Sequence, residues 1–146
     1  MYLLALEVAP KNNTVLPVAA SLLRRVGNYE AARPAFEKTI RTNPMQWVWF
    51  EYAGTLIALK NYPKAKELLQ TGLMRQEICT QNVIVLMHLA AIAVFENDMS
   101  EAKLRCKKAK EATPNFDLEK NLKAISTTTD TEFYNSFIDA IKLACA

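Results

Sequence analysis

The strongest constraint on this sequence is a short motif that recurs along the chain at nearly constant spacing. Three segments, GNYEAA, KNYPKA and NDMSEA, share a turn-like start, a large residue in the middle and a final alanine. The final alanines lie 33 and 37 residues apart, at Ala32, Ala65 and Ala102. Prolines follow a similar period, with steps of 34 and 70 residues between Pro10, Pro44 and Pro114. A period of this size indicates stacked supersecondary units that share one continuous core.

Composition narrows the fold class further. The 146-residue chain is 51% hydrophobic, which is enough to build a sizeable core. It has three glycines, whereas average usage of about 7% would give roughly ten. Glycine supplies the left-handed positions of β-hairpin turns and the close backbone approach of phosphate loops. A multi-stranded β-fold is therefore disfavoured, and neither of the glycine-rich nucleotide motifs occurs. We predict an all-α protein.

The three copies carry matching residue types when they are aligned from Asn13, Gln46 and Val83. Each has a large and then a small residue in its first helix, and a large residue, alanine and another large residue in its second. These residues are Leu16, Ala20, Tyr29, Ala32 and Phe36; Trp49, Ala53, Tyr62, Ala65 and Leu69; and Leu86, Ala90, Met99, Ala102 and Cys106. The pattern resembles the tetratricopeptide repeat (TPR), a helix pair of about 34 residues. Pro44 and Pro114 stand where that family closes a repeat, and Glu77 departs from it.

The resemblance implies a right-handed α-solenoid of antiparallel helix pairs. We expect a partial N-terminal repeat with only its second helix (1–12), three full repeats (13–45, 46–82 and 83–116) and a C-terminal capping helical hairpin (117–146). The expected helices span residues 1–9, 14–26, 29–42, 46–59, 62–75, 82–96, 99–112, 116–126 and 132–144. The alternative for the last helix is that it folds into the chain's own groove or docks on a partner.

Local signals add three expectations about helix ends. Pro34 lies about one turn inside its helix, where it predicts a slight kink or a late helix start. Asp98 and Ser100 compete to cap the helix of residues 99–112. Thr129 and Glu132 have the spacing of a capping box at the start of the last helix.

In TPR proteins the first helices line a concave face that usually binds peptide, so the resemblance implies a partner-binding groove. Its expected residues are Arg24, Arg25, Trp47, Phe50, Glu51, Gly54, Ile84, Met87, His88, Ala91 and Phe95. This set is mostly apolar, which favours a hydrophobic or amphipathic partner segment. The alternative is that its large apolar residues are core residues, or are covered by a neighbouring helix of the same chain.

One well-known use of the fold is disfavoured. Some TPR domains hold the C-terminal carboxylate of the chaperones Hsp70 and Hsp90 with a set of Lys, Asn and Arg residues. The corresponding positions here are Pro17, Ser21, Glu51, Ile84 and His88. We therefore expect no carboxylate clamp.

Charge gives little support for nucleic-acid binding. The formal net charge is +3, well short of a dedicated nucleic-acid binder. The densest basic cluster, Lys103, Lys107, Lys108 and Lys110, reads as a solvated helix face, or alternatively as a contact for an acidic partner or RNA backbone. His88 reads as a polar groove or packing residue.

The cysteines bear on compartment and cofactors. Cys79, Cys106 and Cys145 are odd in number and widely spaced, so we expect no disulfide framework and a reducing, cytoplasmic-type compartment. Cys106 reads as a small core residue. With one histidine, zinc binding is disfavoured and no cofactor or metal site is expected. No apolar run is long enough to span a membrane, and no secretory signal is expected at the N-terminus.

These observations favour a non-enzymatic protein–protein interaction scaffold, such as an adaptor, chaperone or assembly subunit. The alternative is a scaffold of an RNA-processing complex, because Trp49-x-x-Tyr52 and Ala32-Arg33 resemble the half-a-TPR (HAT) repeat, although Leu56 replaces its acidic residue. The apolar face of residues 1–10 predicts either further repeats of a longer protein or a homodimer contact at that end.

Overall fold

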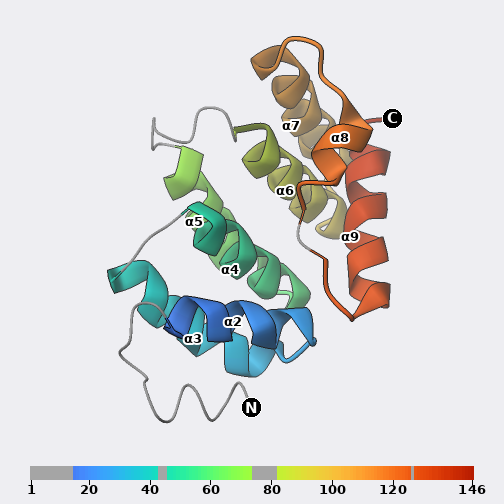
Figure 1. The fold of residues 1–146 in the computed structure, drawn as a ribbon. Helices are drawn as coiled ribbons and strands as arrows, with labels where there is room; N and C mark the ends of the chain where they lie inside the picture. Colours follow the sequence, from blue (N-terminus) through green and yellow to red (C-terminus); the bar gives the residue numbers. More distant parts are fainter. Residues whose placement is uncertain (1–14, 43–45, 74–81, 126) are drawn as a thin grey trace. The chain divides into compact units, whose positions relative to one another are not determined.

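The computed structural model describes residues 15–42, 46–73, 82–125 and 127–146, and all regular secondary structure within them is helical (Figure 1). The expectation of an all-α protein is confirmed for these residues. The helices are α2 (Val15–Arg25), α3 (Tyr29–Thr42), α4 (Gln46–Ala58), α5 (Tyr62–Leu73), α6 (Asn82–Phe95), α7 (Met99–Ala112), α8 (Leu118–Leu122) and α9 (Thr131–Ala144). The expected helix of residues 1–9 lies outside the described residues.

The same turn joins α2 to α3, α4 to α5 and α6 to α7. In each turn one residue is left-handed, with φ of 81° at Gly27, 62° at Lys60 and 61° at Asn97. The amide of the following residue donates to the carbonyl five residues back, at 2.8–2.9 Å. This hydrogen bond, with the one from the left-handed residue to the carbonyl three back, forms a Schellman motif, which satisfies the last carbonyls of the first helix. The recurring sequence motif therefore encodes one recurring backbone turn.

The residue after each left-handed position immediately precedes the next helix. Asn28 Oδ1 accepts from the Ala31 amide at 3.4 Å, and Asp98 Oδ1 accepts from the Glu101 amide at 3.1 Å. Such side-chain caps satisfy amides that lack a partner in the first helical turn. Asp98 is thus the N-cap of α7, and Ser100 is not.

The small residues of the repeat pattern are fully enclosed. All six have no exposed surface, namely Ala20, Ala53, Ala90, Ala32, Ala65 and Ala102. The large residues that end the pattern, Phe36, Leu69 and Cys106, are also buried. Methyl side chains at these points allow close packing of neighbouring backbones, and the larger residues fill the remaining space.

The chain divides into two compact units. Unit 1 comprises Met1–Ala65 and Thr128–Asp130, and unit 2 comprises Lys66–Thr127 and Thr131–Ala146. The division falls within α5.

Unit 1 is built around α2, α3 and α4. Helix α4 packs mainly on α3 and to a smaller extent on α2. The rings of Phe36 and Tyr52 stack with their centroids 5.8 Å apart across the α3–α4 contact. Other buried members of this core include Leu16, Leu23, Val48 and Leu56.

Unit 2 is built around α6, α7 and α9. Helix α9 packs mainly on α6 and to a smaller extent on α7. Ala90 and Ala93 of α6, Ala102 of α7 and Ala144 of α9 form one buried cluster. Because these side chains are small, the three helices approach closely at this end of α9.

Helix α3 begins at Tyr29 and runs through Pro34, so of the two alternatives for this proline the late helix start is excluded. Two other expectations about helix ends are wrong. The helix expected at 116–126 is reduced to α8, because the chain tightens after Leu122 into a turn whose amides bond three residues back. Helix α9 begins at Thr131, and the Thr129 hydroxyl donates to the Arg25 carbonyl at 2.9 Å instead of capping α9.

The expectation of unpaired cysteines is also wrong. Cys106 of α7 and Cys145, which follows α9, form a disulfide between residues 39 apart in sequence. Packing of α9 against α7 brings their Cα atoms to 5.4 Å, a proximity that cysteine spacing does not reveal. The expectation of a reducing compartment rested on unpaired cysteines, so it loses that support.

The left-handed turn residues predict that introducing glycine at these positions stabilises the fold and that removing it destabilises the fold. Lys60→Gly and Asn97→Gly should each raise the free energy of unfolding by roughly 0.5–1 kcal/mol, because glycine has no steric cost at positive φ. Gly27→Ala should lower it by about 1–2 kcal/mol. An added Cβ there would meet only ordinary contact, 3.7 Å from Asp130 Cβ, so the effect isolates the backbone conformation. Chemical denaturation measures all three.

The matched control is Lys107→Gly, at an exposed position inside α7. It should destabilise by about 1 kcal/mol, because glycine weakens a helix interior. If Lys60→Gly and Asn97→Gly also destabilise, the left-handed turns do not limit stability.

Candidate functional site

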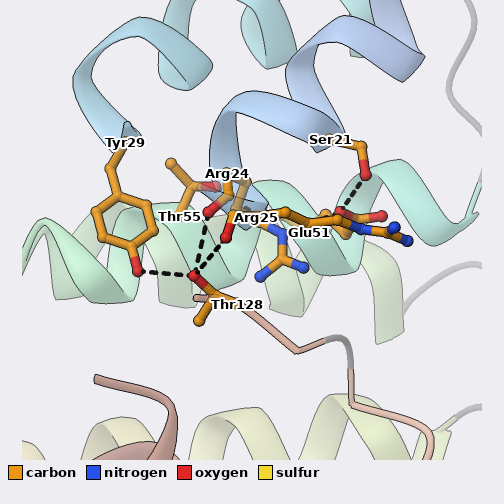
Figure 2. Close-up of polar contacts among 7 residues, drawn as sticks. All are labelled: Ser21, Arg24, Arg25, Tyr29, Glu51, Thr55 and Thr128. Atoms are coloured by element: carbon orange, nitrogen blue, oxygen red, sulfur yellow. Dashed lines mark hydrogen bonds and ion pairs between the residues drawn. The ribbon is translucent and has the colours of Figure 1, made fainter. Parts of the chain in front are cut away.

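A buried ion pair joins α2 to α4 at two residues of the expected groove. Arg24 Nε donates to Glu51 Oε1 at 2.9 Å, and Ser21 Oγ donates to the same oxygen at 2.7 Å (Figure 2). Arg24 and Glu51 are only 4% and 8% exposed. Charges taken this far out of water are tolerated only when they are paired and hydrogen-bonded. The cluster therefore fixes α4 against α2 and neutralises the Glu51 carboxylate.

The segment Thr128–Asp130 closes the C-terminal end of α2. The Thr128 hydroxyl lies 3.3 Å from the Arg24 carbonyl and 3.2 Å from the Arg25 carbonyl (Figure 2). The Thr129 amide donates to the Arg25 carbonyl at 2.7 Å. Carbonyls of a last helical turn lack partners in their own helix, so this distant segment satisfies them.

Tyr29, at the start of α3, secures the same segment. Its hydroxyl donates to Asp130 Oδ2 at 3.1 Å and lies 3.5 Å from Thr128 Oγ1. Burial raises the pKa of Tyr29, and the neighbouring Asp130 carboxylate also raises it, while the hydrogen bond with Thr128 acts in the opposite direction. The neutral phenol is therefore the form that the fold favours.

The groove residues on α4 other than Glu51 are partly accessible. Trp47 is 37% exposed, and Phe50 and Gly54 are half-buried. Nothing outside the helix lies within 4 Å of a Cβ built on Gly54. These residues are three or four apart, so they share one face of α4 with Glu51. On α2, Arg25 is exposed.

The groove residues in the middle of α6 are buried, and one of them meets α9. Met87, His88 and Ala91 are buried. The His88 ring meets Phe137 of α9 edge-on, with centroids 5.1 Å apart. His88 Nδ1 lies 2.7 Å from the Ile84 carbonyl and donates to it, because a carbonyl only accepts. Ile84 and Phe95 are half-buried. Among the expected residues the structure thus joins Arg24 to Glu51, and it places His88 against a helix of the same chain.

Sequence reasoning missed the partners of these residues. The polar residues at 127–130 indicated a helix start, but Thr128 and Thr129 bond to the last carbonyls of α2 instead. The stripe of Phe133, Phe137, Ile138 and Ile141 did identify an amphipathic last helix, and Phe137 and Ile141 are buried. The stripe does not indicate which surface it packs on, because an apolar face packs on any complementary apolar surface.

The remaining features of the described residues do not indicate a metal site or a membrane span. No group of three or more His, Cys, Asp or Glu side chains is arranged to hold a metal ion in the part of the chain that the structure describes. No helix among those residues is long and apolar enough to cross a membrane. The four lysines of α7, at positions 103, 107, 108 and 110, are exposed.

Comparison with known proteins gives no match: no protein-family model matches the chain, and it matches no curated protein and no solved structure. Function is therefore inferred from the residues themselves.

The buried ion pair predicts a large effect of removing one partner. Glu51→Ala should lower the free energy of unfolding by about 3–5 kcal/mol, because Arg24 would be left buried without its counter-charge. Replacing both residues, as Arg24→Met with Glu51→Leu, should recover most of that loss. Urea denaturation of the single and double variants measures the difference.

Glu30→Ala, at an exposed position of α3, is the control and should change stability by less than about 0.5 kcal/mol. A Glu51→Ala protein as stable as this control would mean that the ion pair does not fix α4 on α2.

Tyr52 predicts a loss of stability in alkali. Burial raises its pKa, and the Glu37 carboxylate, which accepts its hydroxyl at 3.2 Å, raises it further. The folded state therefore holds the phenolic proton more tightly, so this stabilisation is complete below about pH 10 and is lost as pH rises through the higher folded-state pKa. In Tyr52→Phe, the fall in unfolding free energy between about pH 8 and about pH 11 should be smaller. An identical fall in both proteins would contradict this. Tyr29, whose pKa is also raised by burial, contributes to the dependence that remains.

Proposed function

We propose that this chain is a protein–protein interaction scaffold, built as a TPR-like solenoid of helix pairs, that binds an amphipathic helix of a partner on the faces of its first helices. Three helix pairs with the same left-handed turn and the same enclosed alanines support the repeat. A repeat protein of this kind displays the equivalent face of each successive first helix, and such faces are the surfaces on which these architectures bind other chains.

The observation that carries the proposal is the packing of α9 mainly on α6, the first helix of its pair. In a regular stack the next helix packs mainly on the second helix of the preceding pair, as α4 does on α3. Helix α9 instead packs mainly on the first helix, α6, where its Phe137 meets His88 edge-on. It does so with Phe137, Ala140 and Ile141 buried, while Glu132, Asp139 and Lys142 are exposed. An amphipathic helix on a helical face is the helix-in-groove mode of recognition.

Helix α4 carries an equivalent face that is still accessible. An offset of 37 residues aligns Phe50 with Met87, Glu51 with His88 and Gly54 with Ala91. Phe50 is apolar like Met87, and Gly54 is even smaller than Ala91, which permits close approach of another backbone. Pairing with Arg24 and Ser21 removes the electrostatic cost of Glu51 at the centre of this face. We assign the α4 face, Trp47, Phe50 and Gly54, as the partner site.

Gly54 offers a test that leaves the fold intact. Because a Cβ at this position has no neighbour within 4 Å, Gly54→Leu should fold and yet obstruct the face. The probe is a labelled peptide of residues 129–146 with serine in place of Cys145, followed by fluorescence anisotropy. Wild type should bind it saturably, and Gly54→Leu should weaken binding at least about tenfold, or ~1.4 kcal/mol.

Gly54→Ala is the matched control, because it adds a methyl group and should stabilise α4 by about 1 kcal/mol without filling the face. Helical circular dichroism establishes that each variant is folded. A folded Gly54→Leu protein that binds the peptide as wild type does would exclude the α4 face.

A further inference from the structure

Helix α9 is held over α6 by one apolar face and a covalent bond at its end. Phe137, Ala140, Ile141 and Ala144 are buried, and the exposed residues of the helix are mostly polar, with Leu143 as an apolar exception. The disulfide from Cys145 to Cys106 fastens the last turn of α9 to α7. A cross-link between residues 39 apart in sequence restricts the states in which α9 has left α6, and so favours the covered state.

The surroundings of the disulfide are strongly basic. Lys103 and Lys110 lie about one turn before and after Cys106 on α7, and Lys107 adjoins it. Lys110 Nζ also donates to the Cys145 carbonyl at 3.4 Å. Positive charge stabilises a thiolate leaving group and attracts an anionic attacking thiolate, and both effects accelerate thiol–disulfide exchange. This cluster of lysines has no role in the proposed partner site.

The two sulfur-bearing residues differ in accessibility. Cys106 is 2% exposed, whereas Cys145 is half-buried and lies after the end of α9. We therefore expect an attacking thiolate to reach the sulfur of Cys145, so that Cys106 leaves as the thiolate. The residue that the lysines flank along α7 is thus the one that carries the developing negative charge.

We propose that the Cys106–Cys145 disulfide is a redox latch that keeps α9 on the α6 face and releases it when reduced by a dithiol. The first thiolate of the dithiol attacks Cys145 Sγ, so a mixed disulfide forms and the bond to Cys106 breaks. The second thiol then displaces Cys145. Two electrons pass to the protein disulfide, the dithiol becomes a disulfide, and its two protons end on Cys106 and Cys145.

Release uncovers His88 and the part of α6 on which α9 packs, and makes that face available to an amphipathic helix from another chain. That availability rests on the proposed function, whereas the release of α9 does not. The two are therefore tested separately.

Hydrogen exchange of the full chain, with and without dithiothreitol and with no peptide added, tests the latch. Peptide mapping first establishes that Cys106 and Cys145 are paired in the oxidised protein. Reduction should accelerate exchange in residues 131–144 by about tenfold or more, while α2 and α3 exchange unchanged. Cys145→Ser should exchange like the reduced protein without any reductant.

Two results would overturn the latch. One is exchange in α9 that reduction leaves unchanged. The other is equal acceleration in α6, α7 and α9, which would mean that the disulfide only stabilises unit 2 as a whole. If α9 is released but the reduced protein gains no peptide binding, the latch stands and the proposed function fails for the α6 face.

The lysines are tested by the rate of reduction. Lys107→Gln with Lys110→Gln should slow reduction by dithiothreitol several-fold, roughly 3- to 10-fold, because the leaving thiolate loses its neighbouring cations. Lys38→Gln removes the same charge from α3 of unit 1 and should leave the rate unchanged. Equal rates in all three proteins would show that the basic cluster does not activate the disulfide.

Discussion

The structure depends on close packing at a small set of alanines that recur in every helix pair. These methyl groups have no exposed surface, so a larger side chain at any of them would have to displace a neighbouring helix. The alanines are useful only if each second helix returns at the correct angle, and the left-handed turn residue sets that angle. Side-chain size and backbone conformation therefore act together, which is why the two features recur at the same period.

The aligned faces of α4 in unit 1 and α6 in unit 2 have different central residues. In α4 the central residue is Glu51, which is buried but neutralised by Arg24 and Ser21. In α6 the corresponding residue is His88, which donates to its own helix and meets an aromatic ring of α9. The corresponding position thus holds a satisfied carboxylate in α4 and a ring packed against an aromatic side chain in α6.

In unit 2, the proposed disulfide latch adds a covalent bond to the packing that holds α9 on α6. Packing of α9 on α6 alone is reversible, because its exposed side is already polar. A cross-link to α7 shifts that balance toward the covered face by limiting the alternatives. In this proposal the lysines of α7 activate a neighbouring cysteine pair. Their exposure on a helix surface does not by itself reveal this role.

The sequence by itself determined the helices, their turns and their enclosed residues, because these follow from local spacing. Ala32, Ala65 and Ala102 mark the second helices, and Gly27, Lys60 and Asn97 mark the turns before them. The sequence did not determine which distant groups meet. The Arg24–Glu51 pair, the capping of α2 by Thr128 and Thr129, and the disulfide each join residues that local periodicity does not connect. Only the tertiary structure decided that α9 packs on α6 and meets His88, because an apolar helical stripe specifies burial but not the surface on which it packs.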